Sequence, residues 1–154
     1  MNRIGLVAAI AATFLMAPPT LAEATAGNPT RTKDVPTKVE SYYRVKWGSL
    51  KDFVALYERN HQPLLEEMRK EGFILDMKSE FAFLHMAAGP RWDMRVTIMY
   101  RDAAAALNDP AWEEKWSKAR ERLYKDLNKL QQEEAQRFAL LEEHWDVVVS
   151  NFPE

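Results

Sequence analysis

The chain has 154 residues, of which 47% are hydrophobic and 29% are charged, and its formal net charge is -2. This composition predicts one globular domain, and the small net charge without a basic run gives no electrostatic basis for binding nucleic acid. The chain contains no cysteine, which excludes disulfides, zinc–thiolate sites, iron–sulfur clusters and thiol nucleophiles.

The N-terminus has the three-part layout of a secretory signal. Arg3 supplies a positive start, residues 4–17 form an uncharged apolar run, and small residues precede Glu23. Cleavage is expected after Ala22, or after Ala26 as an alternative. The apolar run is shorter than the roughly 20 residues that span a bilayer, so no stable membrane insertion is expected once the signal is removed. A periplasmic or secreted protein is predicted, with an uncleaved anchor or a buried N-terminal helix as the alternatives.

Three ranges follow from this layout. Residues 1–22 are expected to be the signal peptide, and residues 23–38 are polar and proline-containing, which indicates a flexible linker. The folded domain is expected over residues 39–154.

Four segments of this domain have the alternation of apolar and polar residues that is typical of strands. They are Val39–Trp47, Phe73–His85, Trp92–Tyr100 and Trp145–Val149. The second and third are separated by a short turn at residues 87–90, which predicts an antiparallel hairpin.

Two helical segments lie between these strands. The first runs from Leu50 to about Glu71, and Pro63 predicts a kink near residues 59–62 because proline lacks a backbone donor. The second runs from Pro110 to about Glu143, and as one helix it would be about 50 Å long. Since a small domain cannot cover that length, we expect a bend, a break or an arm that packs on a partner.

The element order β-α-β-β-α-β predicts an α+β, ferredoxin-like fold, in which two helices cover one face of an antiparallel four-stranded sheet. The strand residues expected to face the helices are Tyr43, Val45, Trp47, Phe81, Phe83, Trp92, Met94, Val96 and Ile98, and Leu75 is expected on the same face. Those expected on the other face are Tyr42, Arg44, Lys46, Lys78, Glu80, Arg95 and Thr97. This second face must meet water or a partner.

Three stretches of the sequence resemble the dimeric α/β-barrel superfamily. The opening YRVKWGSLKDFVALY, from Tyr43, is similar to NIPSNAP-type domains, and the YxxxHxPL pattern from Tyr57 is similar to EthD-type domains. The third stretch is WDMRV, from Trp92. The resemblance covers residues 39–152 and implies a homodimer whose sheets face each other and close a barrel. The superfamily includes cyclases, monooxygenases and dehydratases, and an exported chain with a long second helix departs from its usual members.

His61 is the first candidate for a catalytic residue, because a neutral imidazole can act as a general base near neutral pH. Tyr57 lies one helical turn earlier and could orient the imidazole or a substrate. The alternative is a packed histidine that bonds a backbone carbonyl freed by Pro63, since buried polar groups usually find a hydrogen-bond partner.

A second candidate site is the charged face of the sheet. Its proposed ligand-binding residues are Tyr42, Arg44, Lys46, Glu80 and Arg95, which could bind an anionic ligand inside a closed barrel. The alternative is a network of solvated or inter-subunit ion pairs.

The histidines give no support to a metal site. No two of them have helix-ligand spacing, no HExxH motif occurs, and His85 and His144 lie at the ends of elements, where surface positions are expected. We therefore expect no metal and no cofactor, although a single histidine could still ligate heme.

Three functions remain open at the level of the sequence. The first is an exported homodimer that binds a small organic ligand, with no assured catalysis. The second is an enzyme of EthD or cyclase type that uses His61 as its base, and the third is a structural or interaction protein that docks a partner on its long helix.

Overall fold

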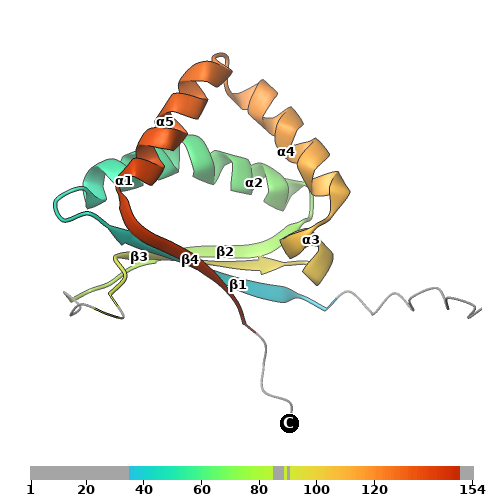
Figure 1. The fold of residues 1–154 in the computed structure, drawn as a ribbon. Coiled ribbons are helices and arrows are strands. Elements are labelled where there is room, and N and C mark those ends of the chain that lie inside the picture. Colours follow the sequence, from blue (N-terminus) through green and yellow to red (C-terminus); the bar gives the residue numbers. More distant parts are fainter. Residues whose placement is uncertain (1–34, 85–88, 90, 150–154) are drawn as a thin grey trace, which may run out of the picture. The chain divides into compact units, whose positions relative to one another are not determined.

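The computed structural model describes residues 35–84, 89 and 91–149, which form one four-stranded sheet with helices on one of its faces (Figure 1). The strands are β1 (Thr37–Val45), β2 (Ile74–Phe81), β3 (Met94–Tyr100) and β4 (Leu141–Val149). Their order is β2-β3-β1-β4, and each neighbouring pair is antiparallel. This topology confirms the predicted α+β, ferredoxin-like fold.

The N-terminal predictions fall outside this description. The signal peptide, both cleavage positions, His85 and most of the expected turn at 87–90 belong to residues that the structure does not describe. β1 begins at Thr37, two residues before the expected start of the domain. Within the described ranges, none of the helices is both long and apolar enough to cross a bilayer.

Both predicted helical segments are divided. The first consists of α1 (Leu50–Leu56), a π-helical turn called η1 (Tyr57–His61) and α2 (Gln62–Lys70). The second follows a short α3 (Ala103–Leu107) and consists of α4 (Pro110–Leu123) and α5 (Leu127–Ala139).

The irregular turn η1 lies where Pro63 predicted a kink. Proline has no N–H to donate to the carbonyl of Arg59, so the α-helical ladder is interrupted there. The chain responds with a wider turn, in which the N–H of Gln62 donates to the carbonyl of Tyr57. Such wide turns are rare and occur frequently at functional sites.

The break in the second segment matches one of the three expected outcomes. The backbone of Tyr124 is extended, and the carboxylate of Asp126 then accepts a hydrogen bond of 2.9 Å from the N–H of Lys129, which caps α5. The expected extent of the segment was wrong at its end, because α5 stops at Ala139 and β4 already begins at Leu141.

Tyr124 joins these two irregular turns, and we expect Tyr124→Phe to lower the free energy of unfolding by about 1–2 kcal/mol. The Tyr124 hydroxyl donates to the carbonyls of Arg59 (3.1 Å) and Asn60 (2.8 Å), which would lose that donor. Urea unfolding measures the change. Tyr42→Phe is the control, because its hydroxyl bonds a carboxylate on the open face of the sheet, and equal losses in the two variants would contradict the prediction.

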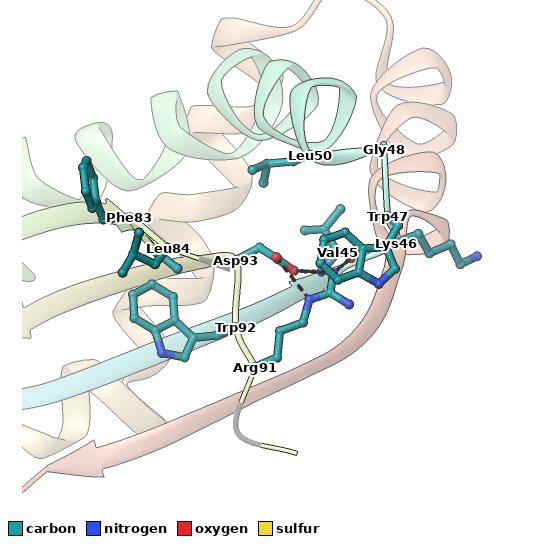
Figure 2. A pocket seen from close by; sticks show the side chains of 11 residues that line it. Val45, Lys46, Trp47, Gly48, Leu50, Phe83, Leu84, Arg91, Trp92 and Asp93 are labelled. Carbon is teal, nitrogen blue, oxygen red and sulfur yellow. Dashed lines mark hydrogen bonds and ion pairs between the residues drawn. The ribbon is translucent and has the colours of Figure 1, made fainter. Parts of the chain in front are cut away.

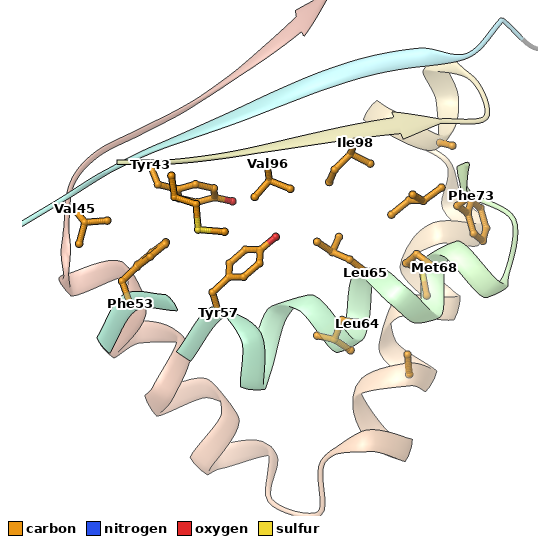
Figure 3. Close-up of a cluster of buried hydrophobic side chains, with 14 residues drawn as sticks. Tyr43, Val45, Phe53, Tyr57, Leu64, Leu65, Met68, Phe73, Val96 and Ile98 are labelled. Carbon is orange, nitrogen blue, oxygen red and sulfur yellow. The ribbon is translucent and has the colours of Figure 1, made fainter. Parts of the chain in front are cut away.

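The core lies between the helices and one face of the sheet (Figure 3). Along β1 and β3 every second residue is buried, as the alternation predicted, and these side chains meet the inward side chains of α1, η1 and α2. The central members are Tyr43, Val45, Met94, Val96 and Ile98 from the strands, with Phe53, Tyr57, Leu64, Leu65 and Met68 from the helices. The predicted inward positions of the five strand residues are confirmed.

Several predicted core positions are corrected. Trp47 lies in the turn after β1 and is 65% exposed, and Phe83 lies beyond β2 and is 98% exposed. A shift in the pairing register between Ile74 and Asp76 buries Ile74 and leaves Leu75 half exposed, since one step of register exchanges the two faces of a strand. Phe81 pairs with Met94 but keeps 51% of its surface exposed, because it lies at the end of an edge strand.

Trp92 is the remaining correction. It precedes β3, and its ring makes an edge contact with Tyr42, at 6.0 Å between centroids. Tyr42 points away from the helices, so Trp92 belongs to the open face of the sheet rather than to the core. The alternation of β3 does not extend back to Trp92, because regular pairing starts only at Met94.

Candidate functional site

The two candidate sites predicted from the sequence lie on opposite sides of the sheet. Tyr57 and His61 belong to η1, on the side that the helices cover. Tyr42, Glu80 and Arg95 lie on the open face, where Tyr42 and Glu80 both pair with Arg95 across the strands. The structure therefore does not combine the two sets into one site.

His61 occupies a position between η1, α4 and α5. Its side chain is 24% exposed, and its ring lies 5.2 Å from the ring of Tyr57 and 5.7 Å from that of Trp116. Nδ1 is 3.9 Å from Oε2 of Glu134, too far for a hydrogen bond. The carbonyl of Arg59, which Pro63 leaves without its helical donor, accepts from Tyr124 instead.

Burial, which is the largest cause, together with the positive charge of Arg137 and the nearby His144, lowers the pKa of His61 to about 3, against an opposing effect of Asp146. The imidazole is therefore neutral at pH 7. A general base works best when its pKa is close to the working pH. A base with a pKa near 3 is about four powers of ten weaker than that optimum, so this environment favours a neutral hydrogen-bonding group over a general base.

The hydroxyl of Tyr57 is buried and has no hydrogen-bond partner among the residues that the structure describes. The side chain is 1% exposed, and burial raises its pKa well above the ordinary range, so the hydroxyl keeps its proton. An unpaired buried hydroxyl costs about 1–3 kcal/mol. Packing alone does not explain why a tyrosine, rather than a phenylalanine, occupies this position.

Arg137 is the main neighbour that the sequence analysis missed. It is 2% exposed, and its guanidinium donates two hydrogen bonds, of 3.1 and 2.7 Å, to the carboxylate of Glu134. The same guanidinium lies 4.5 Å from the ring centre of Phe138 and 5.8 Å from that of Tyr57. The only sequence signal was the spacing of Glu134 and Arg137, three residues apart on a helix.

His144 approaches the same region from β4. Its ring stacks on Tyr43 at 4.4 Å, and Nδ1 carries the proton because it donates, at 2.9 Å, to the backbone carbonyl of Tyr42. Nε2 then faces the carboxylate of Asp146 at 3.7 Å. His144 is exposed, as expected, but it lies within β4 rather than at the end of an element, because the strand begins at Leu141 and directs His144 and Asp146 to the side of the helices.

The open face is built around an aromatic cluster. The ring of Tyr42 stacks on Trp145 at 5.2 Å, and the guanidinium of Arg95 lies 5.6 Å from the ring centre of Trp92. Arg95 also donates a hydrogen bond of 2.7 Å to Glu80.

The charges predicted to bind an anion are engaged within the chain. Arg44 pairs with Glu143 at 2.9 Å. Hydrogen bonds from Lys78 and Arg95 hold the pKa of Glu80 below its usual value. Lys46 lies beyond the end of β1 and donates to the carbonyl of Ala139 at 2.6 Å.

A pocket of about 240 Å³ lies at one end of the sheet (Figure 2). Its polar floor is Arg91, which is 6% exposed and donates to Asp93, to Glu142 and to the carbonyl of Val45. The ring of Trp47 covers the guanidinium of Arg91, with 3.9 Å between the guanidinium carbon and the ring centre. The hydrogen bonds connect β1, β4 and the segment that leads into β3, so Arg91 serves as a structural brace between them.

No group of three or more histidine or acidic side chains in the described ranges is placed to hold a metal ion. No protein-family model matches the sequence, and no curated protein matches it.

Solved structures of similar fold include a dimeric ferredoxin-like protein from an uncultured marine organism, with a TM-score of 0.48 and 8% identity over 80% of this chain and 96% of that chain. An EthD family protein from Bacillus halodurans gives 0.45 and 14% identity over 77% of this chain and 100% of that chain. A NIPSNAP family protein from Agrobacterium tumefaciens gives 0.42 and 13% identity over 76% and 86%. The likeness lies in the fold.

Proposed function

We propose that this protein is exported and binds a small organic ligand on the helix-covered side of its sheet, beside Tyr57 and His61, without assured catalysis. Its open sheet face pairs with a second copy. The signal-like N-terminus supports export, and the aromatic cluster of Tyr42, Trp92 and Trp145 supports pairing, because aromatic residues are enriched at protein interfaces.

The observation that carries the proposal is the unpartnered hydroxyl of Tyr57. A buried donor without a partner destabilises the empty protein, and a ligand oxygen or nitrogen would remove that cost. The ring of His61 lies beside the ring of Tyr57 and a quarter of the His61 side chain is exposed, so His61 marks the side from which a ligand would arrive. Access to the hydroxyl requires local opening around η1.

The neutral imidazole favours binding over the alternative of a general base. At neutral pH His61 offers one donor and one acceptor without a charge, which suits a polar but uncharged group of a ligand. Arg137 and Glu134 pair with each other, so the two side chains together carry no net charge, although the guanidinium still disfavours a proton on His61.

Tyr57→Phe tests the proposal, because a ligand that bonds the Tyr57 hydroxyl would be lost from the variant while the fold is kept. We expect the variant to be as stable as the wild type or up to about 2 kcal/mol more stable, since it loses an unsatisfied donor, and to lose its ligand. Native mass spectrometry of both proteins, recovered from the exported fraction of the source cells, detects the retained ligand, and urea unfolding gives the stability.

The same spectra report the other parts of the proposal. The mass of the protomer distinguishes cleavage after Ala22 from cleavage after Ala26, and absence of the protein from the exported fraction would contradict export. A monomer at micromolar concentration would contradict pairing of the open faces. If the wild type carries no bound small molecule and Tyr57→Phe is destabilised, Tyr57 serves packing and the proposal is contradicted.

A further inference from the structure

The outward face of α1 borders an apolar groove of about 610 Å³. We call this face the α1 stripe, and it consists of Leu50, Lys51, Val54 and Ala55 of α1 together with Glu58 of the following η1. Phe81, half exposed at the end of β2, forms the opposite wall of the groove. Phe53 and Leu56 of α1 are buried, Leu50 and Val54 are partly buried against the core, and Lys51, Ala55 and Glu58 are the exposed part of the stripe.

Lys51 and Glu58 frame the apolar part of the stripe, and both are exposed. Within the described part of the chain neither forms an ion pair, in contrast to exposed charges of α4 such as Lys115 and Lys118, which pair with Glu71 and Glu114. The two ends of the α1 stripe therefore carry opposite and uncompensated charges.

Two copies of the stripe that run in opposite directions place opposite charges against each other. Positions 51, 54, 55 and 58 share one face of a helix. If a second α1 lies antiparallel, about a two-fold axis between Val54 and Ala55, each Lys51 lies opposite Glu58 of the partner subunit. A parallel arrangement would instead set like charges against each other, which opposes it. The small side chain of Ala55 permits close approach at the axis.

We propose that the α1 stripe docks on the α1 stripe of a second copy of this chain, in antiparallel orientation. The contact is isologous, so it closes on itself and does not grow into a filament. The apolar residues supply most of the affinity, whereas the exposed charges set the orientation.

The stripe lies on the helical side of the sheet and leaves the open face unoccupied, so both contacts can form at once. Two pairs of subunits joined by their sheets would then assemble into a closed tetramer when the two-fold axes of the two contacts are perpendicular and intersect. If the sheets do not pair, the stripe alone gives a dimer.

A charge exchange tests the contact by sedimentation velocity at low ionic strength. Lys51→Glu and Glu58→Lys each place like charges opposite each other, and each is expected to halve the mass of the assembly. The double variant restores both pairs in reversed form and should recover the wild-type mass. A single variant with unchanged mass, a double variant that does not recover, or a wild type that stays monomeric would overturn the proposal.

Crosslinking gives an independent measurement that does not depend on the sheet contact. Because the chain has no cysteine, Ala55→Cys introduces one thiol beside the proposed axis. A short thiol-specific crosslinker should convert this variant to a covalent dimer. Ala135→Cys, exposed on α5, is the control and should remain monomeric. No covalent dimer from Ala55→Cys, or the same yield from both variants, would overturn the proposal.

Discussion

The Arg137→Ala variant is expected to lose about 3–5 kcal/mol of unfolding free energy, the largest effect of any single change considered for this chain. The guanidinium is almost completely buried, so its removal leaves the Glu134 carboxylate without its partner. It also opens a cavity beside Phe138 and Tyr57, and such cavities destabilise in proportion to their size.

Arg122→Ala is the matched control for this prediction. Arg122 also pairs with a glutamate, Glu67, but its side chain is 62% exposed, so an effect below about 1 kcal/mol is expected. Urea unfolding followed by tryptophan fluorescence compares the two. Similar losses in both variants would show that burial of Arg137 does not carry the stability assigned to it.

Stability is expected to fall by about 2 kcal/mol between pH 7 and pH 5 because of His61 alone. Its pKa is about 3 in the folded protein, against an ordinary value of 6.5. As the pH falls below 6.5 the unfolded chain takes up a proton that the folded chain refuses, so protonation favours unfolding. The loss continues until the pH reaches the folded pKa.

His61→Gln isolates this contribution. Urea unfolding of the wild type and the variant at pH 7 and pH 5 should show a smaller loss in the variant. The carboxylates of Glu40, Glu67 and Asp102 have lowered pKa values, and most of their stabilising effect is lost only below about pH 4.5, outside the window. An equal loss in both proteins would mean that the folded protein protonates His61 readily.

The sheet was predictable where its strands are central. β1 and β3 are each paired on both sides and covered by helices on one face, so burial imposes a strict alternation on their sequence. The alternation was misleading at the ends and edges. Leu75 follows the apolar pattern, but a register shift that depends on pairing with β3 turns it outward. Trp92 also follows the apolar pattern, but its ring contacts another aromatic residue on the open face instead of the core.

The positions of the helices along the chain were predictable, but which of their residues face inward around the irregular turn was not. The proline signalled an irregularity near residue 60, yet the sequence does not say whether the chain bends or widens its turn. Asn60 is 2% exposed because η1 directs it inward, where its amide donates to Glu133 at 2.8 Å. Asp126 is a residue type typical of helix caps and therefore indicated the break. The apolar helical pattern continues across this position and predicted one helix.

The candidate site was predictable only in the part carried by one helix. Tyr57 and His61 share a turn, so their proximity follows from sequence spacing. Arg137 and His144 reach them from α5 and β4, and that encounter depends on how far the last helix extends before the chain returns as a strand. An error of two to four residues at that boundary changes which side chains face the core.

The wide turn at Tyr57–His61 also sets how many residues this part of the chain must contain. Each residue of an α-helix advances the chain by about 100° around the axis. The π-helical turn η1 holds one residue more than an α-helical turn, so deleting one residue from it would restore the α-helical ladder and leave α1 and α2 nearly in phase. Among related sequences, a deletion of one residue between Phe53 and Leu64 should therefore occur only where position 63 is not proline, because proline does not fit the interior of a regular α-helix.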